Sequence, residues 1–287
     1  NVDGFLIEGN KIHDNNNIGI DMIGFEGMAS HQDEAGGINP YDADYVRNGI
    51  CRNNFVYNIS TEGNEVYYED GEYDLCAGGI YVDGGQNIEI YNNFIFNCDI
   101  GVEVATEHSP DDNELFKVSG INVHDNVIAD CTGWAGIVFG GYDKDLGFTE
   151  DCVFDYNTLI DNVYQIVVQR SQNNRVCSNL ILGGEEGIHF EYLVWGDSLV
   201  NEISGNAASG IMNEESWSEV FGTVYPDRSE TKDGFRSLVE DTGSRVVPDK
   251  EMTAVYKAQI TRKRWNNLKE RVKSWFDRYF GEPEEEN

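Results

Sequence analysis

Two acidic residues stand at related positions in consecutive copies of a repeated segment. Asp83 ends a run that reads Gly-Ile-Tyr-Val-Asp, and Glu103 lies in the middle of Val-Glu-Val. Successive strand residues point to opposite faces, and the aliphatic neighbours Ile80 and Val102 favour a core, so both carboxylates are expected to face outward. Two nearby carboxylates acquire different pKa values, as the acid and the nucleophile or base of a glycosidase require. The simpler interpretation is that Asp83 makes a turn with Gly84-Gly85 and that Glu103 is solvated.

Other polar and aromatic side chains are expected to line the same groove and bind substrate. Asp21 occupies the equivalent strand one repeat earlier, and Glu107 follows Glu103 in the next loop. Tyr142 could offer a platform for a sugar ring, while Arg170 could contact substrate or pair with a nearby glutamate. The predicted site comprises Asp83 and Glu103 as catalytic residues, with Tyr81, Asp21, Glu107, His108, Tyr142, Asp143 and Arg170 as substrate-binding residues.

Metal-binding patterns are scarce in this chain. Its six cysteines form no Cys-x-x-Cys pair, so a zinc site is not expected. No cofactor is predicted to be required, and calcium held by acidic loops is the alternative. Cys98 and Cys131 occupy the same column of adjacent repeats. We expect the cysteines to be small buried core residues, although a disulfide between these two is geometrically conceivable.

A repeated pattern predicts how these residues are positioned. One asparagine column recurs along the chain, and its shortest step, from Asn157 to Asn179, is 22 residues. Apolar residues alternate in short segments, which is strand periodicity, and Asn, Gly and Asp between them favour tight corners. We therefore predict an all-β fold, a right-handed parallel β-helix in which stacked asparagines bond along the axis. The column comprises Asn10, Asn54, Asn93, Asn126, Asn157, Asn179 and Asn206.

In such a stack the two acidic residues lie on neighbouring coils. The coil spacing and a two-residue offset along the strand place their backbones roughly 8 Å apart. Side chains that lean together could bring the carboxylates to about 5 Å, the separation of a retaining glycosidase pair.

The repeats over roughly residues 1–215 resemble the pectin-lyase-like superfamily of parallel β-helix proteins. Within them, Gly79-Ile80-Tyr81-Val82-Asp83, Val102-Glu103-Val104 and His108 resemble a motif of the β-xylosidase-like glycoside hydrolase family 120. In those enzymes the aspartate is the nucleophile and the glutamate is the acid/base. The resemblance therefore implies these roles for Asp83 and Glu103, with a plant or microbial polysaccharide or oligosaccharide as substrate.

Charge is distributed unevenly along the 287 residues, which carry a formal net charge of −32. Residues 1–225 contain 39 Asp and Glu but 7 Lys and Arg, whereas residues 226–287 contain 13 of each class. Such a field repels nucleic acid and anionic membranes, and it disfavours polyanionic substrates unless a cation bridges them. The expected partner is a neutral or weakly charged carbohydrate, without nucleic acid or membrane insertion. The expected protein is a monomer located outside the cell or at its surface.

Two regions are expected along the chain. Residues 1–215 form the β-helix, which begins inside a coil-like segment, so earlier coils and a cap are expected to precede it. Insertions at about 24–47, 60–77, 105–117 and 141–150 are expected to project from one side and wall the site. Residues 216–287 form an extension with an amphipathic helix over about 253–280 and an acidic tail. Its apolar face, which should cap the solenoid, comprises Trp265, Leu268, Val272, Trp275 and Phe276.

Three functions remain open at this point. The first is a glycoside hydrolase that uses the Asp83 and Glu103 pair. The second is a polysaccharide lyase, which needs a cationic base and neutralisation of a uronate, for which Arg170 is the outward-facing candidate. The third is a non-catalytic glycan-binding or surface β-helix, which would lack converging carboxylates.

Overall fold

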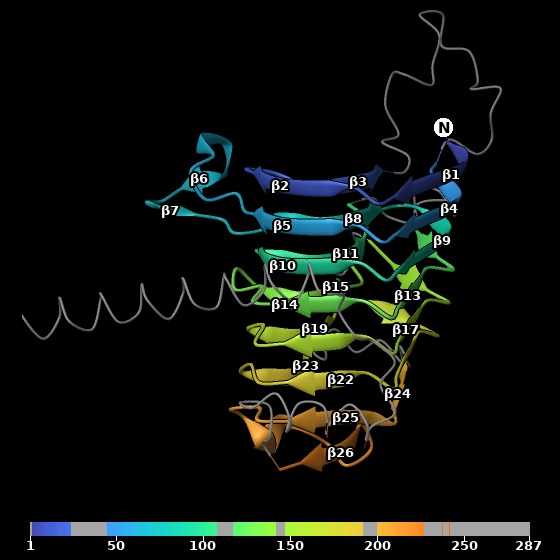
Figure 1. The fold of residues 1–287 in the computed structure, drawn as a ribbon, viewed down its shortest axis with the longest axis vertical. Helices are drawn as coiled ribbons and strands as arrows, with labels where there is room; N and C mark the ends of the chain where they lie inside the picture. The colour runs from blue at the N-terminus through green and yellow to red at the C-terminus, as the bar shows by residue number, and fades with distance from the viewer. Residues whose placement is uncertain are drawn as a thin grey trace, which may run out of the picture. The chain divides into compact units, whose positions relative to one another are not determined.

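The computed structural model describes residues 2–23, 45–107, 117–141, 147–191 and 200–226, together with Ser237 and Asp241. Three sheets of parallel strands are stacked coil upon coil, which confirms the predicted parallel β-helix (Figure 1). The chain divides into two compact units, Asn1–Val246 and Val247–Asn287. The second unit lies outside the described residues, and so does the helix predicted over 253–280. In the described part of the chain, no helix combines the length and apolar character needed to span a membrane.

The coils up to β23 each contribute one strand or strand pair to each sheet, and β24, β25 and β26 extend sheets A and B. Sheet A contains β1 (Asp3–Glu8), β4 (Arg47–Arg52), β9 (Gln86–Tyr91), β12 (Val118–Ser119), β13 (Asn122–His124), β16 (Thr149–Glu150), β17 (Val153–Asp155), β20 (Ser171–Gln172), β21 (Arg175–Cys177) and β24 (Glu202–Ser204). Sheet B contains β2 (Lys11–Asn15), β5 (Phe55–Ile59), β10 (Phe94–Cys98), β14 (Val127–Ala129), β18 (Thr158–Ile160), β22 (Leu180–Leu182), β25 (Asn206–Ser209) and β26 (Gly222–Tyr225). Sheet C contains β3 (Ile20–Ile23), β8 (Gly78–Asp83), β11 (Ile100–Ala105), β15 (Ala135–Phe139), β19 (Tyr164–Val168) and β23 (Glu186–Phe190).

The core runs between the three sheets and is filled by one face of every strand. In sheet C the aliphatic residues that follow the glycine column, such as Ile80, Val102 and Ile137, are fully buried. Phe139 of sheet C stacks on Phe154 of sheet A with ring centroids 4.3 Å apart. The strand alternation therefore leaves the opposite side chains on the outer faces of the sheets.

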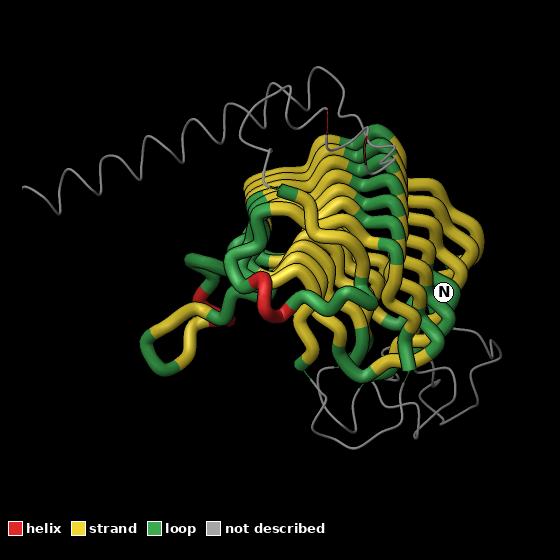
Figure 2. The backbone as a smooth tube through the Cα atoms, turned by 90° about the horizontal axis from the view of Figure 1, so that it is seen from below, coloured by secondary structure: helices red, strands yellow, loops and turns green. Residues whose placement is uncertain are grey.

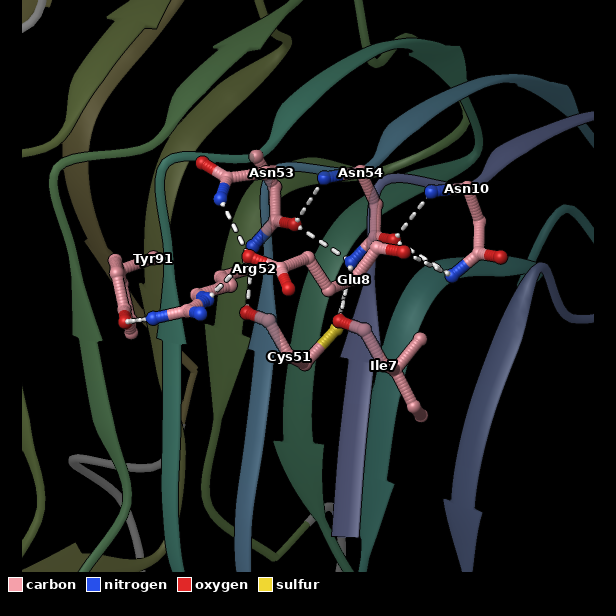
Figure 3. A network of polar contacts seen from close by, with 9 residues as sticks. Ile7, Glu8, Asn10, Cys51, Arg52, Asn53, Asn54 and Tyr91 are labelled. Atoms are coloured by element: carbon pink, nitrogen blue, oxygen red, sulfur yellow. Dashed lines mark hydrogen bonds and ion pairs between the residues drawn. The ribbon is translucent and has the colours of Figure 1, made fainter.

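The asparagine column forms a continuous ladder at the corner between sheets A and B, as predicted. The backbone and side-chain amides of Asn93 both donate to Oδ1 of Asn126 at 3.0 Å. Asn126 repeats this pair of bonds with Asn157, and its amide also donates to the carbonyl of Ile90 at 2.8 Å. Figure 3 shows the first steps of the ladder, where Asn10 donates to Asn54. Each buried amide is therefore satisfied by the coils beside it.

The next corner, between sheets B and C, needs a left-handed backbone in every coil. Asn58, Asn97, Asp130 and Asp161 have φ between 52° and 55° there, a region that Asn and Asp tolerate better than other side chains. The following coil uses Gly183, at which a Cβ would lie 2.1 Å from Oδ1 of Asp161. These constraints explain why Asn, Asp and Gly punctuate the sequence.

The insertions leave the solenoid at two edges of sheet C. Residues 24–44, 108–116 and 142–146, which are not described, follow β3, β11 and β15. The insertion at 60–77 instead enters β8, so it lies at the opposite edge of that sheet. It contains the short helix η2 (Glu65–Tyr67) and an antiparallel hairpin of β6 (Tyr68–Glu69) and β7 (Glu72–Tyr73), which projects from the coils (Figures 1 and 2).

All six cysteines are described and all are free thiols. Cys51, Cys98, Cys131 and Cys152 are buried, as expected for small core residues. Burial, together with a hydrogen bond to Cys131, raises the pKa of Cys98 well above its ordinary value.

Aromatic residues close the lower end of the core. Trp217 follows the short helix η4 (Glu214–Ser216), and a Cβ at Gly187 would lie 2.6 Å from its ring. Its indole donates to the carbonyl of Gly222 at 3.2 Å, and its ring meets Phe221 edge to face at 5.8 Å. Parallel pairing continues beyond this point, because β26 pairs with β25. Trp217 and Phe221 thus pack against the end of the core that lies beside Gly187.

Replacement of Trp217 by alanine should reduce the free energy of unfolding by about 2 kcal/mol, since the lost side chain is partly buried. Chemical denaturation of the full chain measures this loss. Val220→Ala is the matched control because its side chain is 73% exposed, and it should leave the midpoint almost unchanged. Equal midpoints for the two variants would show that Trp217 does not close the core.

Candidate functional site

The acidic residues meet on the outer face of sheet C, on its first three strands. Tyr81 in β8 is in register with Asp21 in β3 and with Glu103 in β11. Asp83 is in register with Ala105, two residues further along the strand than Glu103. The two predicted catalytic residues therefore share one face of adjacent strands, as the alternation predicted. Asp21, Tyr81, Asp83, Glu103 and Glu107 are called the acidic cluster below.

Glu103 is the most perturbed carboxyl group of this cluster. Its side chain is partly buried, and its Oε2 lies 3.6 Å from the position of a Cβ at Gly78. Burial raises the pKa of Glu103 to about 8, and the negative charges of Asp83, Glu107 and Asp21 add to the rise in that order. Desolvation and like charges both disfavour the carboxylate, so Glu103 keeps its proton at neutral pH.

Tyr81 lies at the centre of the acidic cluster. It is 9% exposed, and its pKa is raised by burial and then by the charges of Glu103, Asp83, Glu107 and Asp21. The phenol therefore lies within the field of four acidic side chains.

Two residues of the insertion at 60–77 lie beside the cluster, although the sequence did not single them out. Burial raises the pKa of Cys76 to about 11, with further contributions from Asp74 and Glu103. Burial also raises the pKa of Tyr67, followed by the charges of Cys76 and Glu107. The Tyr67 hydroxyl donates to Oδ1 of Asn17 at 3.2 Å, which ties this insertion to the first coil.

An apolar patch continues the outer face of sheet C beyond the cluster. It consists of Ile100, Ala135, Val138 and Val167, all buried, with the partly buried Trp134 and Tyr164 packed against it. At 0–1% exposure, the four buried side chains offer no open apolar surface beside the cluster.

One prediction about this face was wrong. The alternation that places Arg170 on the outer face also places Val168 there, but Val168 belongs to the core, and Val167 is the residue in register with Val138. The next outward residue is Gln169, whose amide donates to Glu191 at 2.9 Å. Arg170 therefore follows a different direction: its guanidinium lies 5.4 Å from the Phe148 ring centroid and donates to the carbonyl of Gly147.

The remaining predicted residues divide into two groups. Asp21 and Glu107 interact electrostatically with Glu103 and Tyr81, so they lie in the same cluster as Asp83 and Glu103. His108, Tyr142 and Asp143 lie outside the described residues.

The described basic side chains of the solenoid have other partners. Arg47 pairs with Asp3 at 3.1 Å, and Arg175 lies 3.6 Å from Asp155. Arg52 pairs with Glu8 at 2.7 Å and donates to the Tyr91 hydroxyl (Figure 3). Lys117 pairs with Glu150, and Lys11 lies over the rings of Phe55 and Tyr57.

Among the described residues, no three His, Cys, Asp or Glu side chains are arranged to hold a metal ion. The acidic cluster is therefore best described as a set of carboxyl groups around a phenol. Such a set can donate a proton from Glu103 and can accept protons or bind cations through the other carboxylates.

Comparison with known proteins gives a family for this chain. Residues 35–225 match the family model described as "Periplasmic copper-binding protein (NosD)". The uncharacterized protein YwoF from Bacillus subtilis (strain 168) is 39% identical over 192 residues, which cover 64% of this chain and 36% of that protein. The chain thus spans about a third of the length of this relative, and no solved structure matches it. The extent of the family match shows that the chain belongs to the NosD family.

Proposed function

We propose that this protein is a glycoside hydrolase that acts outside the cytoplasm. The observation that supports this most is Glu103, a partly buried carboxylic acid whose pKa is raised to about 8 on the same sheet face as Asp83. A general acid must hold its proton at the working pH, which burial and like charges achieve here. The family's description as periplasmic supports the proposed location.

The relative placement of the pair favours inversion of the anomeric centre. Asp83 stands two residues beyond the position opposite Glu103, which is about 6.6 Å along the strand. The Glu103 carboxyl group instead lies over Gly78, before that position in β8. This offset along the strand is compatible with the roughly 6.5–9.5 Å between carboxyl groups that admits a water molecule in an inverting enzyme.

In the proposed reaction Glu103 gives its proton to the glycosidic oxygen as the bond to the anomeric carbon breaks. Asp83 removes a proton from a water molecule as the water oxygen forms the new bond to that carbon. The resemblance to family 120 implied that Asp83 is a nucleophile. The position of the Glu103 carboxyl group over Gly78, away from Asp83, favours the role of general base for Asp83 instead. Both roles use the same two residues, and the stereochemistry of the product distinguishes them.

Copper fits the described residues poorly, although the family description mentions it. Copper favours thiolate and imidazole ligands. Burial raises the pKa of Cys51 and of Cys152 to about 12, so these thiols remain protonated. The described histidines each place Nδ1 on a neighbouring carboxylate, and none joins a cluster of three ligands. The proposed reaction therefore assigns no step to a metal.

A lyase is supported less well than a hydrolase. Elimination from a uronate needs a cationic group near the substrate carboxylate, and Arg170 has Phe148 and Gly147 as its neighbours. A non-catalytic binding protein would have no need of a carboxylic acid perturbed as strongly as Glu103. The perturbed acid therefore favours hydrolysis over both alternatives.

Replacement of Asp83 by asparagine should abolish turnover, because the asparagine amide cannot remove a proton from water. The measurement is release of reducing ends from a panel of neutral oligosaccharides by the full chain. Asp151→Asn is the matched control, since Asp151 is exposed and its φ of 56° suits asparagine equally well.

Proton NMR of the first-formed product should show the anomer opposite to that of the substrate. Retention would reassign Asp83 as the nucleophile within the same proposal. Unsaturated products would replace the hydrolase with a lyase, and glycan binding without cleavage by wild type would replace it with a binding protein.

A further inference from the structure

One buried carboxyl group holds both ends of the insertion at 60–77. Asp99 lies at the corner between β10 and β11 and is 4% exposed. Its Oδ2 accepts the backbone amide of Thr61 at 2.8 Å, where the insertion begins, and that of Ala77 at 3.1 Å, where it ends. The Thr61 hydroxyl lies 3.1 Å from the same oxygen. A single oxygen atom therefore draws the two ends of the insertion together.

The coils hold Asp99 itself in place. Its backbone amide donates to the carbonyl of Ile59 at 2.9 Å, and its own carbonyl accepts the amide of Trp134 at 2.8 Å. A Cβ at Gly133 would lie 2.6 Å from the Cα of Asp99, so the neighbouring coil packs directly on this residue. Asp99 is therefore a fixed point of the solenoid to which the insertion is attached.

The clamped end of the insertion lies beside Glu103. Gly78 follows Ala77 directly, and Oε2 of Glu103 lies 3.6 Å from the position of a Cβ at Gly78. Cys76 precedes Ala77, and its backbone amide donates to the Thr61 hydroxyl at 3.3 Å. The charge of Glu103 contributes to the raised pKa of the Cys76 thiol, which places the two side chains in one another's field. The insertion thus ends where it can exclude water from Glu103.

We propose that Asp99 is a positioning residue that clamps the insertion at 60–77 against Glu103 and so keeps water from this acid. The inference rests on the proposed function, because it concerns the general acid of the same site. Burial is the largest cause of the raised pKa of Glu103, which gives the clamp a measurable consequence. Without it, water should reach Glu103 and lower that pKa toward its ordinary value of 4.5.

Other groups that act on Glu103 come from several elements. They are Asp21 on β3, Tyr81 and Asp83 on β8, Glu107 after β11 and Cys76 in the insertion. On the remaining side, β15 presents the apolar Val138 in register with Glu103. The charges that raise the pKa of Glu103 are those of Asp83, Glu107 and Asp21. Asp99 should therefore act on Glu103 through the insertion and not through its own charge.

Titration of the Glu103 carboxyl group tests the proposal without any substrate. Carbon-13 NMR of the full chain with labelled glutamate follows the carboxyl resonances, and the resonance lost in Glu103→Gln identifies this residue. The same assignment of Glu89, which is exposed on sheet A, through Glu89→Gln provides a reference signal. Asp99→Ala should lower the pKa of Glu103 by about one unit or more, because burial shifts of several units depend on the exclusion of water.

Two further variants separate the clamp from charge and from folding. Asp99→Asn keeps an oxygen that can accept the same hydrogen bonds, so it should restore the wild-type pKa of Glu103. Thr61→Val removes the hydroxyl and keeps the backbone amide, so it should lower this pKa by less than Asp99→Ala. Glu72→Ala is the matched control, since Glu72 is exposed on β7 of the same insertion, and it should leave the pKa of Glu103 unchanged.

An unchanged pKa of Glu103 in Asp99→Ala would overturn the proposal, as would an unchanged value in Thr61→Val if Asp99→Ala does not fold. Equal falls in Asp99→Ala and Asp99→Asn would also overturn it, because they would assign the effect to charge.

The titration and a glycan assay can fail independently. A lowered pKa in Asp99→Ala, with a wild-type protein that cleaves no glycan, would support the clamp and remove the hydrolase. Glycan cleavage by the wild type, with a Glu103 pKa that Asp99→Ala leaves unchanged, would leave the hydrolase standing and remove the clamp.

Discussion

Replacement of Glu103 by glutamine should lower kcat/KM for unactivated glycans by about 10²- to 10⁴-fold, which is the usual contribution of a general acid. Glutamine has nearly the same shape but cannot donate a proton to the glycosidic oxygen. Substrates with good leaving groups need little protonation, so the variant should retain most activity toward an aryl glycoside. Kinetics on the two substrate types measure the difference, and an equal loss on both would contradict the role of acid.

The pH dependence provides a second measurement on the same variant. Wild-type kcat/KM should fall as the pH rises through about 8, where free Glu103 ionises, and the variant should lack this alkaline limb. Stability should change with the same group. An unfolded glutamate has its ordinary pKa of 4.5 and releases a proton that the folded state retains up to about pH 8. The free energy of unfolding of the wild-type protein should therefore fall as the pH rises between these two values. The melting temperature of Glu103→Gln should therefore exceed that of wild type above pH 8, whereas Glu89→Gln should follow wild type throughout.

Replacement of Asn126 by alanine should reduce the free energy of unfolding by about 3–5 kcal/mol, because several buried groups lose their partners at once. The two amides of Asn93 lose the Asn126 oxygen, and the carbonyl of Ile90 loses the Asn126 amide. Water cannot replace these bonds easily, since Asn126 has 0% exposure. Urea denaturation of the full chain measures the loss.

Asn10→Ala is the control from the same ladder. Asn10 is exposed, and both its backbone and side-chain amides donate to Oδ1 of Asn54. Alanine at this position removes the side-chain bond and keeps the backbone bond. Its cost should be about 1 kcal/mol. If both alanine variants unfold at the same urea concentration, the ladder bonds contribute little to stability.

The repeat could be predicted from sequence because its residues have narrow structural requirements. Asparagine alone can donate and accept in a stack of identical side chains, and the left-handed corners admit Asn, Asp and Gly. The error at Val168 has a physical cause in the same terms. Gln165 takes the place that glycine holds in the preceding coil, and three aliphatic residues follow, so alternation cannot be recognised there.

The acidic pair could be predicted because Asp83 and Glu103 lie within regular strands, whose faces alternate. Tyr67 and Cys76 could not, since they belong to an insertion that follows no period. The size of the rise in the pKa of Glu103 could not be predicted from the sequence either. It depends on burial and on the charge of Glu107, which lies beyond the strand in a loop.

Because the asparagine ladder at the corner between sheets A and B is the same from coil to coil, the number of coils can change without changing the acidic cluster. The step from Asn157 to Asn179 uses the same pair of amide bonds as the step from Asn93 to Asn126. The acidic cluster draws on β3, β8, β11 and Glu107, two residues after Ala105, and the described residues from β16 onward are not part of it. Gene recombination at a corner asparagine can therefore add or remove a whole lower coil and keep the hydrogen-bond register. Members of such a lineage can differ in length while inheriting the same acidic cluster.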